Sequence, residues 1–390
     1  MTATTATTAP PRLHGLDALR AAALGLGIVL HSLIPFAPGA LWLVTDSVTS
    51  DAVNVPLVLI HLFRMVLFMM LAGYFGRMVL HRRGTGAYLR DRALRILLPL
   101  VAFWPVAVLS LGILVGVNVA LRGVEPPPTP AADASPLLAF TPGQLWFLLV
   151  LMECVLITVV VRAVARRLAG PDRVARLSGR AGALLASPWG VGLAAVPYLV
   201  GLLVQGHTAG GIVEPFTVLP EVAPLVTYLG AFGVGWFLQA RPDALTRLAA
   251  TWPVHLGAAV VLSAVVLLGA AALPLWAAAA ITALAGWTWT YGLVGVCSRY
   301  LTRERPVVRY LADASYWMYL LHLPLLVGIE ILLADLAWPI PVKLVLTWAV
   351  TAVVLLLGYD LLVRGTWLGA WLNGRRRPRA LRRRRTVAAG

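Results

Sequence analysis

The chain has 390 residues, of which 60% are hydrophobic and 12% are charged, and its formal net charge is +16 at pH 7. Its mean hydropathy is +0.84. Because soluble domains are about half apolar and a quarter charged, this composition excludes an ordinary soluble protein and predicts a polytopic membrane protein. Both cysteines lie in apolar runs, and the sequence has no metal-ligand or phosphate-loop motif, so we expect neither a disulfide framework nor a metal site.

Apolar segments long enough to cross a bilayer, which takes about 20 residues, recur along the chain. The sequence predicts an all-α transmembrane helix bundle with ten spans, at residues 16–36, 54–80, 94–118, 144–165, 188–206, 221–240, 252–271, 273–297, 311–333 and 341–364. Pro274 would form the turn between the seventh and eighth spans. Residues 1–12 are predicted to be a disordered tail, residues 13–372 a single transmembrane domain, and residues 373–390 an arginine-rich cytoplasmic tail. The loop near 119–143 is expected to be an extended linker.

The distribution of basic residues predicts the orientation of the bundle. Of the 32 basic residues, 28 lie before the first span or in the segments around the ends of spans 2, 4, 6, 8 and 10. Arg122 and Lys343 lie at the opposite boundary, and Arg20 and Arg64 lie well within spans. The positive-inside rule then predicts that both termini are cytoplasmic. The net charge is therefore a topology signal, and we expect the basic tail to lie on anionic lipid and not to bind nucleic acid.

The first span contains an ionisable residue near each end, in the segment RAAALGLGIVLH from Arg20 to His31. Eleven positions are almost three helical turns, so both side chains lie on one face with about 16 Å between their levels. An arginine at the inner end can bind a phosphate or carboxylate, and a histidine deeper in the bundle can take a proton from a hydroxyl. The alternative is that Arg20 reaches lipid phosphate and His31 only bonds a neighbouring helix.

Arg64 lies well inside the second span, where a charged side chain needs an anionic partner. Glu153 on the fourth span is predicted at similar depth. The two residues could form a structural tie between helices, or Arg64 could bind substrate, and the sequence leaves both interpretations open. Trp146, at the outer start of the fourth span, is most simply an interfacial anchor.

Two further segments contain polar residues at the expected membrane boundary or within it. RDRALR precedes the third span and places Arg92 and Arg95 on one helix face, where spacing alone favours ordinary positive-inside charge but two guanidinium groups could also bind a phosphorylated ligand. DASYWMYLLHLPL begins the ninth span, with Asp313 near its inner end and Tyr319 and His322 near mid-membrane. Such a polar stripe is either functional or a set of interhelical bonds.

Together these motifs resemble the integral-membrane acyltransferase-3 family, and within it the branch called glucans biosynthesis protein C. The arginine, ten residues and histidine of RAAALGLGIVLH match the first-span pattern, FRMVLFMMLAGYF resembles the second-span motif, and RDRALRILLPL contains the arginine pair before the third span. LWFLL and DASYWMYLLHLPL resemble the fourth-span and ninth-span motifs. The likeness covers about residues 13–335. Many relatives have histidine in place of Arg64 and glutamate in place of Asp313.

The resemblance implies acyl transfer, of the succinyl or acetyl class, from cytoplasmic acyl-CoA to a hydroxyl of an extracytoplasmic glycan or glycolipid, in a bacterial cytoplasmic membrane. It implies no permanently bound cofactor. By resemblance, His31 would be the base, supported by Asp313 and His322, and the donor would be bound by Arg20, Arg92 and Arg95. Candidate contacts to the acyl group or acceptor are Arg64, Glu153, Trp146 and Tyr319.

Two other classes of function compete with this interpretation. A transporter of a polar or anionic solute could place Arg20, His31 and Arg64 along its route, although no convincing repeat relates the two halves of the sequence. Alternatively, a structural subunit could use its buried charges only to tie helices together.

Overall fold

The computed structural model describes residues 13–40, 42–125, 141–269 and 272–380, and within these ranges it contains helices and no strand. The predicted all-α class is therefore confirmed. The tail predicted at residues 1–12 and most of the linker predicted near 119–143 lie outside the described residues, as does the tail beyond residue 380.

Thirteen helices follow one another along the described chain. They are α1 (His14–Leu33), α2 (Asn54–Arg83), α3 (Thr85–Arg92), α4 (Leu98–Arg122), α6 (Trp146–Ala169), α7 (Pro171–Leu185), α8 (Gly190–Gln205), α9 (Val222–Gln239), α10 (Ala244–Gly269), α11 (Leu275–Tyr300), α12 (Pro306–Leu333), α13 (Ile340–Gly358) and α14 (Trp367–Asn373). Short π-helical turns, Ala93–Leu97 and Tyr359–Arg364, join α3 to α4 and extend α13.

Nine of the described helical segments are long and apolar enough to cross a membrane, and the pair α7 and α8 makes a tenth if it counts as one bent span. Nine of the ten predicted spans thus coincide with helices that are long and apolar enough to cross a membrane, and the fifth does so only as part of a bent pair. The segment predicted at 188–206 is α8, whose axis turns by 97° from that of α7. At this break Gly190 lies so close to the carbonyl oxygen of Leu185 that a Cβ would approach it within 2.0 Å, so the sharp turn needs a glycine. Pro274 directly precedes α11, as predicted.

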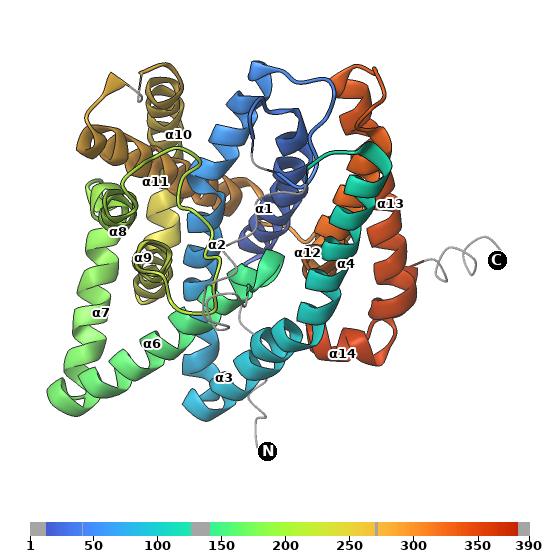
Figure 1. Cartoon of the computed structure of the whole chain (residues 1–390). Helices are drawn as coiled ribbons and strands as arrows, with labels where there is room; N and C mark the ends of the chain where they lie inside the picture. The colour runs from blue at the N-terminus through green and yellow to red at the C-terminus, as the bar shows by residue number, and fades with distance from the viewer. Residues whose placement is uncertain (1–12, 41, 126–140, 270–271, 381–390) are drawn as a thin grey trace.

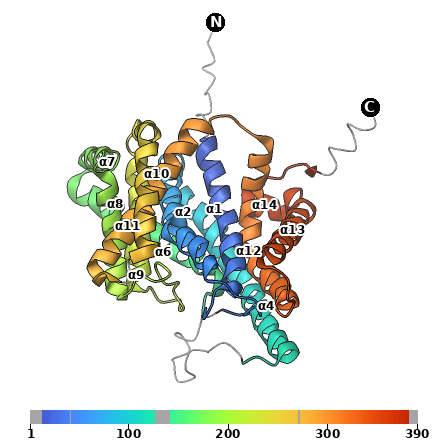
Figure 2. The same ribbon diagram turned by 90° about the horizontal axis from the view of Figure 1, so that it is seen from above.

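Helices α1 and α2 lie at the centre of the bundle (Figures 1 and 2), with α7, α8, α10 and α11 on one side and α4, α12, α13 and α14 on the other. Glycines allow the central helices to approach closely: a Cβ on Gly73 of α2 would lie 1.9 Å from the carbonyl oxygen of Phe232 on α9, and one on Gly235 of α9 would lie 1.8 Å from that of Met70. Small residues at such crossings are typical of membrane helix packing.

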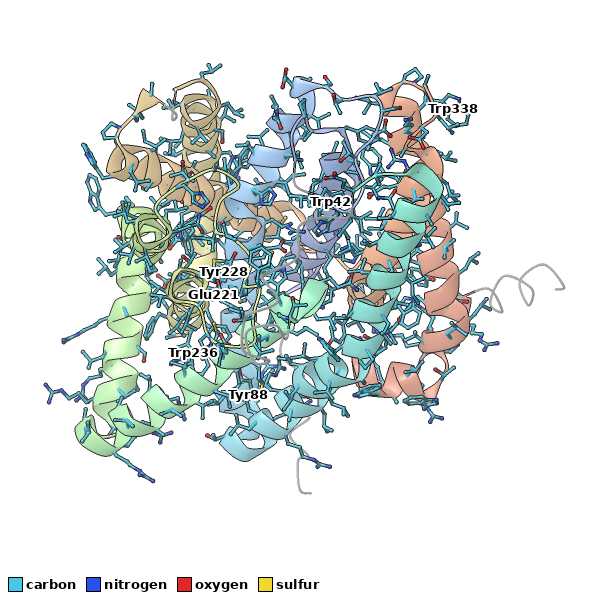
Figure 3. All side chains as sticks on the ribbon, in the orientation of Figure 1. Trp42, Tyr88, Glu221, Tyr228, Trp236 and Trp338 are labelled. Atoms are coloured by element: carbon cyan, nitrogen blue, oxygen red, sulfur yellow. The ribbon has the colours of Figure 1, made fainter. Side chains whose placement is uncertain are left out.

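The two ends of the bundle differ in their side chains. Helices α3 and α14 lie at the lower edge of Figure 1. We call this the arginine-rich end, because Arg82, Arg92 and Arg95 lie here. At the opposite end lie Trp42, in the loop after α1, and Trp338, in the loop before α13 (Figure 3).

Candidate active site

Two adjoining cavities lie between α1, α2, α6 and α12. One, of about 560 Å³, extends from the arginine-rich end. The other, of about 530 Å³, lies deeper in the bundle. Phe68, Phe147, Ser315 and Tyr319 line both, so the two volumes meet at these side chains. We call them the arginine cavity and the histidine cavity.

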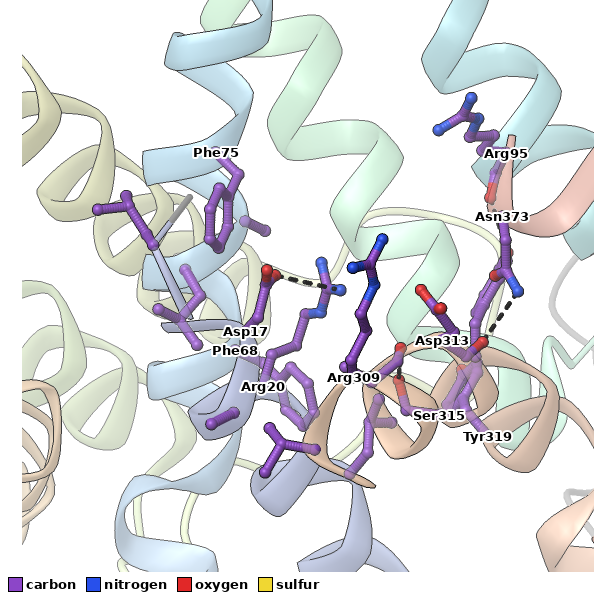
Figure 4. A pocket seen from close by; sticks show the side chains of 18 of the residues that line it. Asp17, Arg20, Phe68, Phe75, Arg95, Arg309, Asp313, Ser315, Tyr319 and Asn373 are labelled. Atoms are coloured by element: carbon purple, nitrogen blue, oxygen red, sulfur yellow. Dashed lines mark hydrogen bonds and ion pairs between the residues drawn. The ribbon is translucent and has the colours of Figure 1, made fainter. Parts of the chain in front are cut away.

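The arginine cavity is strongly basic. Its charged lining consists of three carboxylates, Asp17, Glu304 and Asp313, and eight arginines: Arg20, Arg82, Arg92, Arg95, Arg303, Arg305, Arg309 and Arg375. Figure 4 shows Arg20 and Arg309 directed into this space, with Phe68 and Phe75 beside them. Such a concentration of guanidinium groups is suited to a ligand with several negative charges, because each guanidinium group can bind a phosphate oxygen pair in a bidentate way.

Arg20 lies in the arginine cavity, as the first-span pattern predicts. Its guanidinium group is 3.6 Å from the Asp17 carboxylate one turn earlier on α1 and lies 6.0 Å from the centre of the Phe75 ring. His31, eleven residues later on the same helix, lines the other cavity. The predicted arrangement of these two residues along one interior path is therefore present in the structure.

Arg92 and Arg95 also line the arginine cavity, positioned by the π-helical turn that begins after Arg92. Both approach the carboxylate of Asp91, at 2.7 Å for Arg92 and 3.3 Å for Arg95. The Tyr316 hydroxyl donates a hydrogen bond of 2.7 Å to the carbonyl oxygen of Arg95, which ties this turn to α12. π-Helical turns are frequent at functional sites because they re-aim side chains within a helix.

Asp313 lies at the arginine-rich end and is separated from His322 by nine residues of α12, or about 13 Å along the helix axis. It forms ion pairs with Arg375 at 3.4 Å and Arg377 at 2.9 Å. The Asn373 side chain donates to its carbonyl oxygen at 2.9 Å. The structure therefore places Asp313 against the segment that follows α14. The resemblance implies that Asp313 supports His31, but the structure does not bring it to the histidines.

The histidine cavity brings together ionisable and aromatic residues from four α-helices, the short turn before α6 and two loops. Its polar and aromatic lining includes His31, Trp42, Arg64, Gln144, Trp146, Glu214, Tyr319 and His322. Three atoms among these side chains are buried without a hydrogen-bond partner in the described residues: Nδ1 of His31, Nε of Arg64 and Oε1 of Gln144. Buried polar groups are normally bonded, so this cavity has unused hydrogen-bonding capacity for a ligand.

His31 and His322 face each other across the histidine cavity, with their ring centres 5.4 Å apart. Nδ1 of His322 is 2.8 Å from the carbonyl oxygen of Tyr319. Because a carbonyl oxygen only accepts, this nitrogen carries the proton, and in the neutral ring Nε2 is then a proton acceptor. The structure therefore brings His322 next to His31, and neither ring is paired with a carboxylate among the described residues.

Arg64 is buried and its NH1 lies against Gly27 of α1, where a Cβ would approach within 2.6 Å. The main negative charge acting on it is Glu214, from the loop between α8 and α9. Burial raises the pKa of the Glu214 carboxyl, while the positive charge of Arg64 and the indole N–H of Trp146 oppose this shift. Glu153 lines neither cavity, whereas Glu214 lines the histidine cavity together with Arg64, so the acid that acts on Arg64 is not the one that depth alone suggested.

Trp146 and Tyr319 line the histidine cavity, inside the bundle. Trp146 is buried against Tyr228, with ring centres 5.8 Å apart, so the expected interfacial anchor is an interior residue. The Tyr319 hydroxyl donates to the carbonyl oxygen of Gln144 at 2.9 Å, and the Gln144 amide donates to the carbonyl oxygen of Leu320 at 3.0 Å. These bonds join the start of α6 to α12 at the junction of the two cavities.

Sequence reasoning missed several lining residues. Trp42 and Glu214 lie in loops, where no helical periodicity marks an inward-facing position. Arg303, Arg305 and Arg309 count in the sequence only as topology signals, but they line the arginine cavity from the end of the loop before α12 and the first turn of that helix.

The comparisons with known proteins agree with the motifs. The model of the acyltransferase-3 family, which is described as an acyltransferase domain, matches residues 13–363. No curated protein and no solved structure matches the chain significantly.

Proposed function

The chain belongs to the acyltransferase-3 family, and from this membership and the two cavities we propose that it moves an acyl group from cytoplasmic acyl-CoA to a hydroxyl of an extracytoplasmic glycan or glycolipid. The observation that supports this most directly is the junction of the two cavities. A cavity lined by eight arginines adjoins one that contains two facing histidines. This arrangement would bring a polyanionic donor and a base to one place.

The donor would lie in the arginine cavity. Coenzyme A has a diphosphate and a 3′-phosphate, which match guanidinium groups in charge and geometry. Arg20, Arg92 and Arg95 would bind these phosphates, and the pantetheine arm would pass Phe68 and Phe147 toward the histidine cavity. In this orientation the thioester approaches His31.

His31 would act as the general base. The acceptor hydroxyl gives its proton to the imidazole as its oxygen attacks the thioester carbonyl, the C–S bond breaks, and the departing thiolate takes the proton from the imidazolium. In a second route the imidazole nitrogen attacks the thioester carbonyl, the C–S bond breaks and coenzyme A leaves as the thiolate. The acceptor hydroxyl then attacks the acyl-imidazolium, the C–N bond breaks to regenerate the neutral imidazole, and the hydroxyl proton goes to the thiolate. His322 lies 5.4 Å from His31, and its Nε2 can accept a hydrogen bond from the acceptor or from His31.

Arg64 would select the acyl group. Its Nε is buried without a partner among the described residues, so it can donate to a carboxylate at the end of a succinyl group. Glu214 already supplies one negative charge nearby. Arg64→Gln is therefore expected to reduce transfer from succinyl-CoA more than transfer from acetyl-CoA, and an equal effect on both would contradict selection by Arg64.

We assign the arginine-rich end to the cytoplasm of a bacterial cell, in its cytoplasmic membrane. This orientation follows from the excess of arginine there and provides cytoplasmic acyl-CoA with access to the arginine cavity.

The test measures free thiol release by the purified protein in lipid, with acetyl-CoA or succinyl-CoA as donor and a short glucan as acceptor. His31→Ala is expected to abolish acceptor-dependent release. His255→Ala is the matched control, because His255 is also buried but packs against Tyr291 and lines neither cavity. The absence of release by folded wild-type protein with any donor would favour the transporter interpretation. Thiol release that persists in His31→Ala would agree with an acyltransferase but would contradict the role of His31 as its base.

A further inference from the structure

The loop that follows α1 places Trp42 directly against His31. The indole and imidazole rings are stacked, with centres 5.5 Å apart and planes 12° apart. Trp42 also lines the histidine cavity. It therefore contacts the proposed base from the end of the bundle opposite the arginine cavity.

Among the described residues, no hydrogen bond fixes the plane of the His31 ring. Its Nδ1 is buried and has no partner in the part of the chain that the structure describes. Catalytic histidines are usually oriented by a carboxylate or carbonyl at the second ring nitrogen. Here the contacts that remain to orient the ring are the stack on Trp42 and the tilted contact with His322, whose planes differ by 42°.

Trp42 is itself held by Glu330 of α12. The indole N–H donates to Oε2 of Glu330 at 3.2 Å, and this glutamate is only 6% exposed. The loop is also anchored by Asp46, whose carboxylate accepts bonds of 2.7 and 2.8 Å from the buried Lys343. Trp42 thus cannot leave His31 without breaking a buried hydrogen bond.

We propose that Trp42 is a positioning residue for His31 and that Glu330 fixes the indole in the stacking position. The stack holds the imidazole plane so that its proton-accepting nitrogen meets the acceptor hydroxyl. When His31 takes the proton, the resulting imidazolium faces the indole π-surface, an arrangement that favours the cation. This inference rests on the proposed role of His31 as the base.

The first experiment compares Trp42→Ala with the wild type in the thiol-release assay. Loss of the stack is expected to lower kcat by about 10- to 100-fold, since small misplacements of a reacting group have effects of this size. The KM for the acyl-CoA donor should not change, because the arginine cavity is intact. Trp338→Ala, which removes an exposed indole at the same end of the bundle, is the control and should behave as wild type.

The second experiment isolates the hydrogen bond. Trp42→Phe keeps an aromatic ring but lacks the N–H, and Glu330→Leu removes the acceptor, so each should lower kcat by about threefold to tenfold, and the double variant should be no worse than either single one. Glu330→Gln retains an amide oxygen as acceptor and should restore nearly full activity. If Trp42→Ala does not fold, the comparison of Trp42→Phe, Glu330→Leu and their double variant tests the positioning role by itself.

The proposal is overturned if Trp42→Ala retains the wild-type kcat, if its loss appears instead in the donor KM, or if the effects of Trp42→Phe and Glu330→Leu are simply additive. His31→Ala distinguishes this failure from failure of the proposed function. If His31→Ala is inactive while the Trp42 variants are normal, only the positioning role is wrong. If His31→Ala is active, the base assignment itself is wrong.

Discussion

Replacement of Gly27 by alanine would test whether the position of Arg64 matters for acyl transfer. A Cβ on Gly27 would lie 2.6 Å from NH1 of Arg64, with the guanidinium carbon next at 3.8 Å. Non-bonded heavy atoms prefer separations of about 3.5 Å or more. The guanidinium group must therefore retreat by about 1 Å. The obstacle is the end of a flexible side chain rather than a backbone atom, so the helices themselves need not move.

The size of the effect follows from this geometry. Alanine is favoured over glycine inside a helix by about 1 kcal/mol, which offsets part of the strain of moving Arg64, about 1–3 kcal/mol if the side chain cannot relax fully. We therefore expect the thermal unfolding midpoint of Gly27→Ala to stay within a few degrees of wild type. A displacement of 1 Å at a group that contacts the acyl chain can reduce turnover by about 100-fold. Activity should thus fall much more than stability.

The assay is thiol release from succinyl-CoA and acetyl-CoA, together with thermal unfolding of the same preparation. Gly25→Ala is the matched control, because Gly25 lies two residues earlier on α1, lines the same cavity, and has no atom within 4 Å of an added Cβ. Wild-type activity with succinyl-CoA in Gly27→Ala would refute the argument that Arg64 works at its observed position. Equal loss in Gly25→Ala would show that cavity volume, and not Arg64, is responsible.

Three further predictions concern stability and pH. Lys343→Met leaves the carboxylate of Asp46 buried and unpaired, and should destabilise the protein by about 3–5 kcal/mol in thermal or denaturant unfolding, with part of the loss recovered when Asp46→Asn is added. Burial raises the pKa of the Glu214 carboxyl, so its carboxylate is lost on acidification at a pH above the usual glutamate range. Activity that depends on this carboxylate should fall in the same pH range, and the pH–rate profile of Glu214→Gln should not show this acidic decline. Gly73→Ala, whose Cβ would lie 1.9 Å from a carbonyl oxygen of α9, should prevent normal folding as measured by size-exclusion chromatography, whereas Gly112→Ala, with open space around it, should not.

Helical periodicity accounts for what the sequence could predict about the site. Arg20 and His31 lie eleven positions apart on one helix, so their common face follows from 3.6 residues per turn, and both line the proposed route. The pair Arg92 and Arg95 was predicted to share a face for the same reason. Its direction into the arginine cavity, however, also depends on a π-helical turn that no spacing rule predicted.

The remaining parts of the site depend on contacts between segments far apart in the chain. The sequence predicts Glu153 at a depth similar to that of Arg64 and so makes it a candidate partner. Depth does not say which face of α6 meets α2, however. The acid that acts on Arg64 is Glu214, which lies in a loop. Trp42 has no neighbours in sequence that distinguish it from an interfacial tryptophan. Asp313 lies on the predicted helix, but the chain after α14 returns to form ion pairs with it. No pattern in the sequence predicted these ion pairs.

The return of the chain to Asp313 changes the role that this residue plays in the proposed reaction. Asp313 and Arg375 both line the arginine cavity, and a Cβ on Gly374 would lie 2.2 Å from NH2 of Arg95. The segment after α14 is therefore part of the wall around the donor site. Asp313 compensates the positive charge of Arg375 and Arg377, so that they can approach arginines already present there. On this argument its carboxylate shapes the arginine cavity electrostatically, about 13 Å along α12 from His322, and in the proposed reaction the acid–base step would belong to the two histidines.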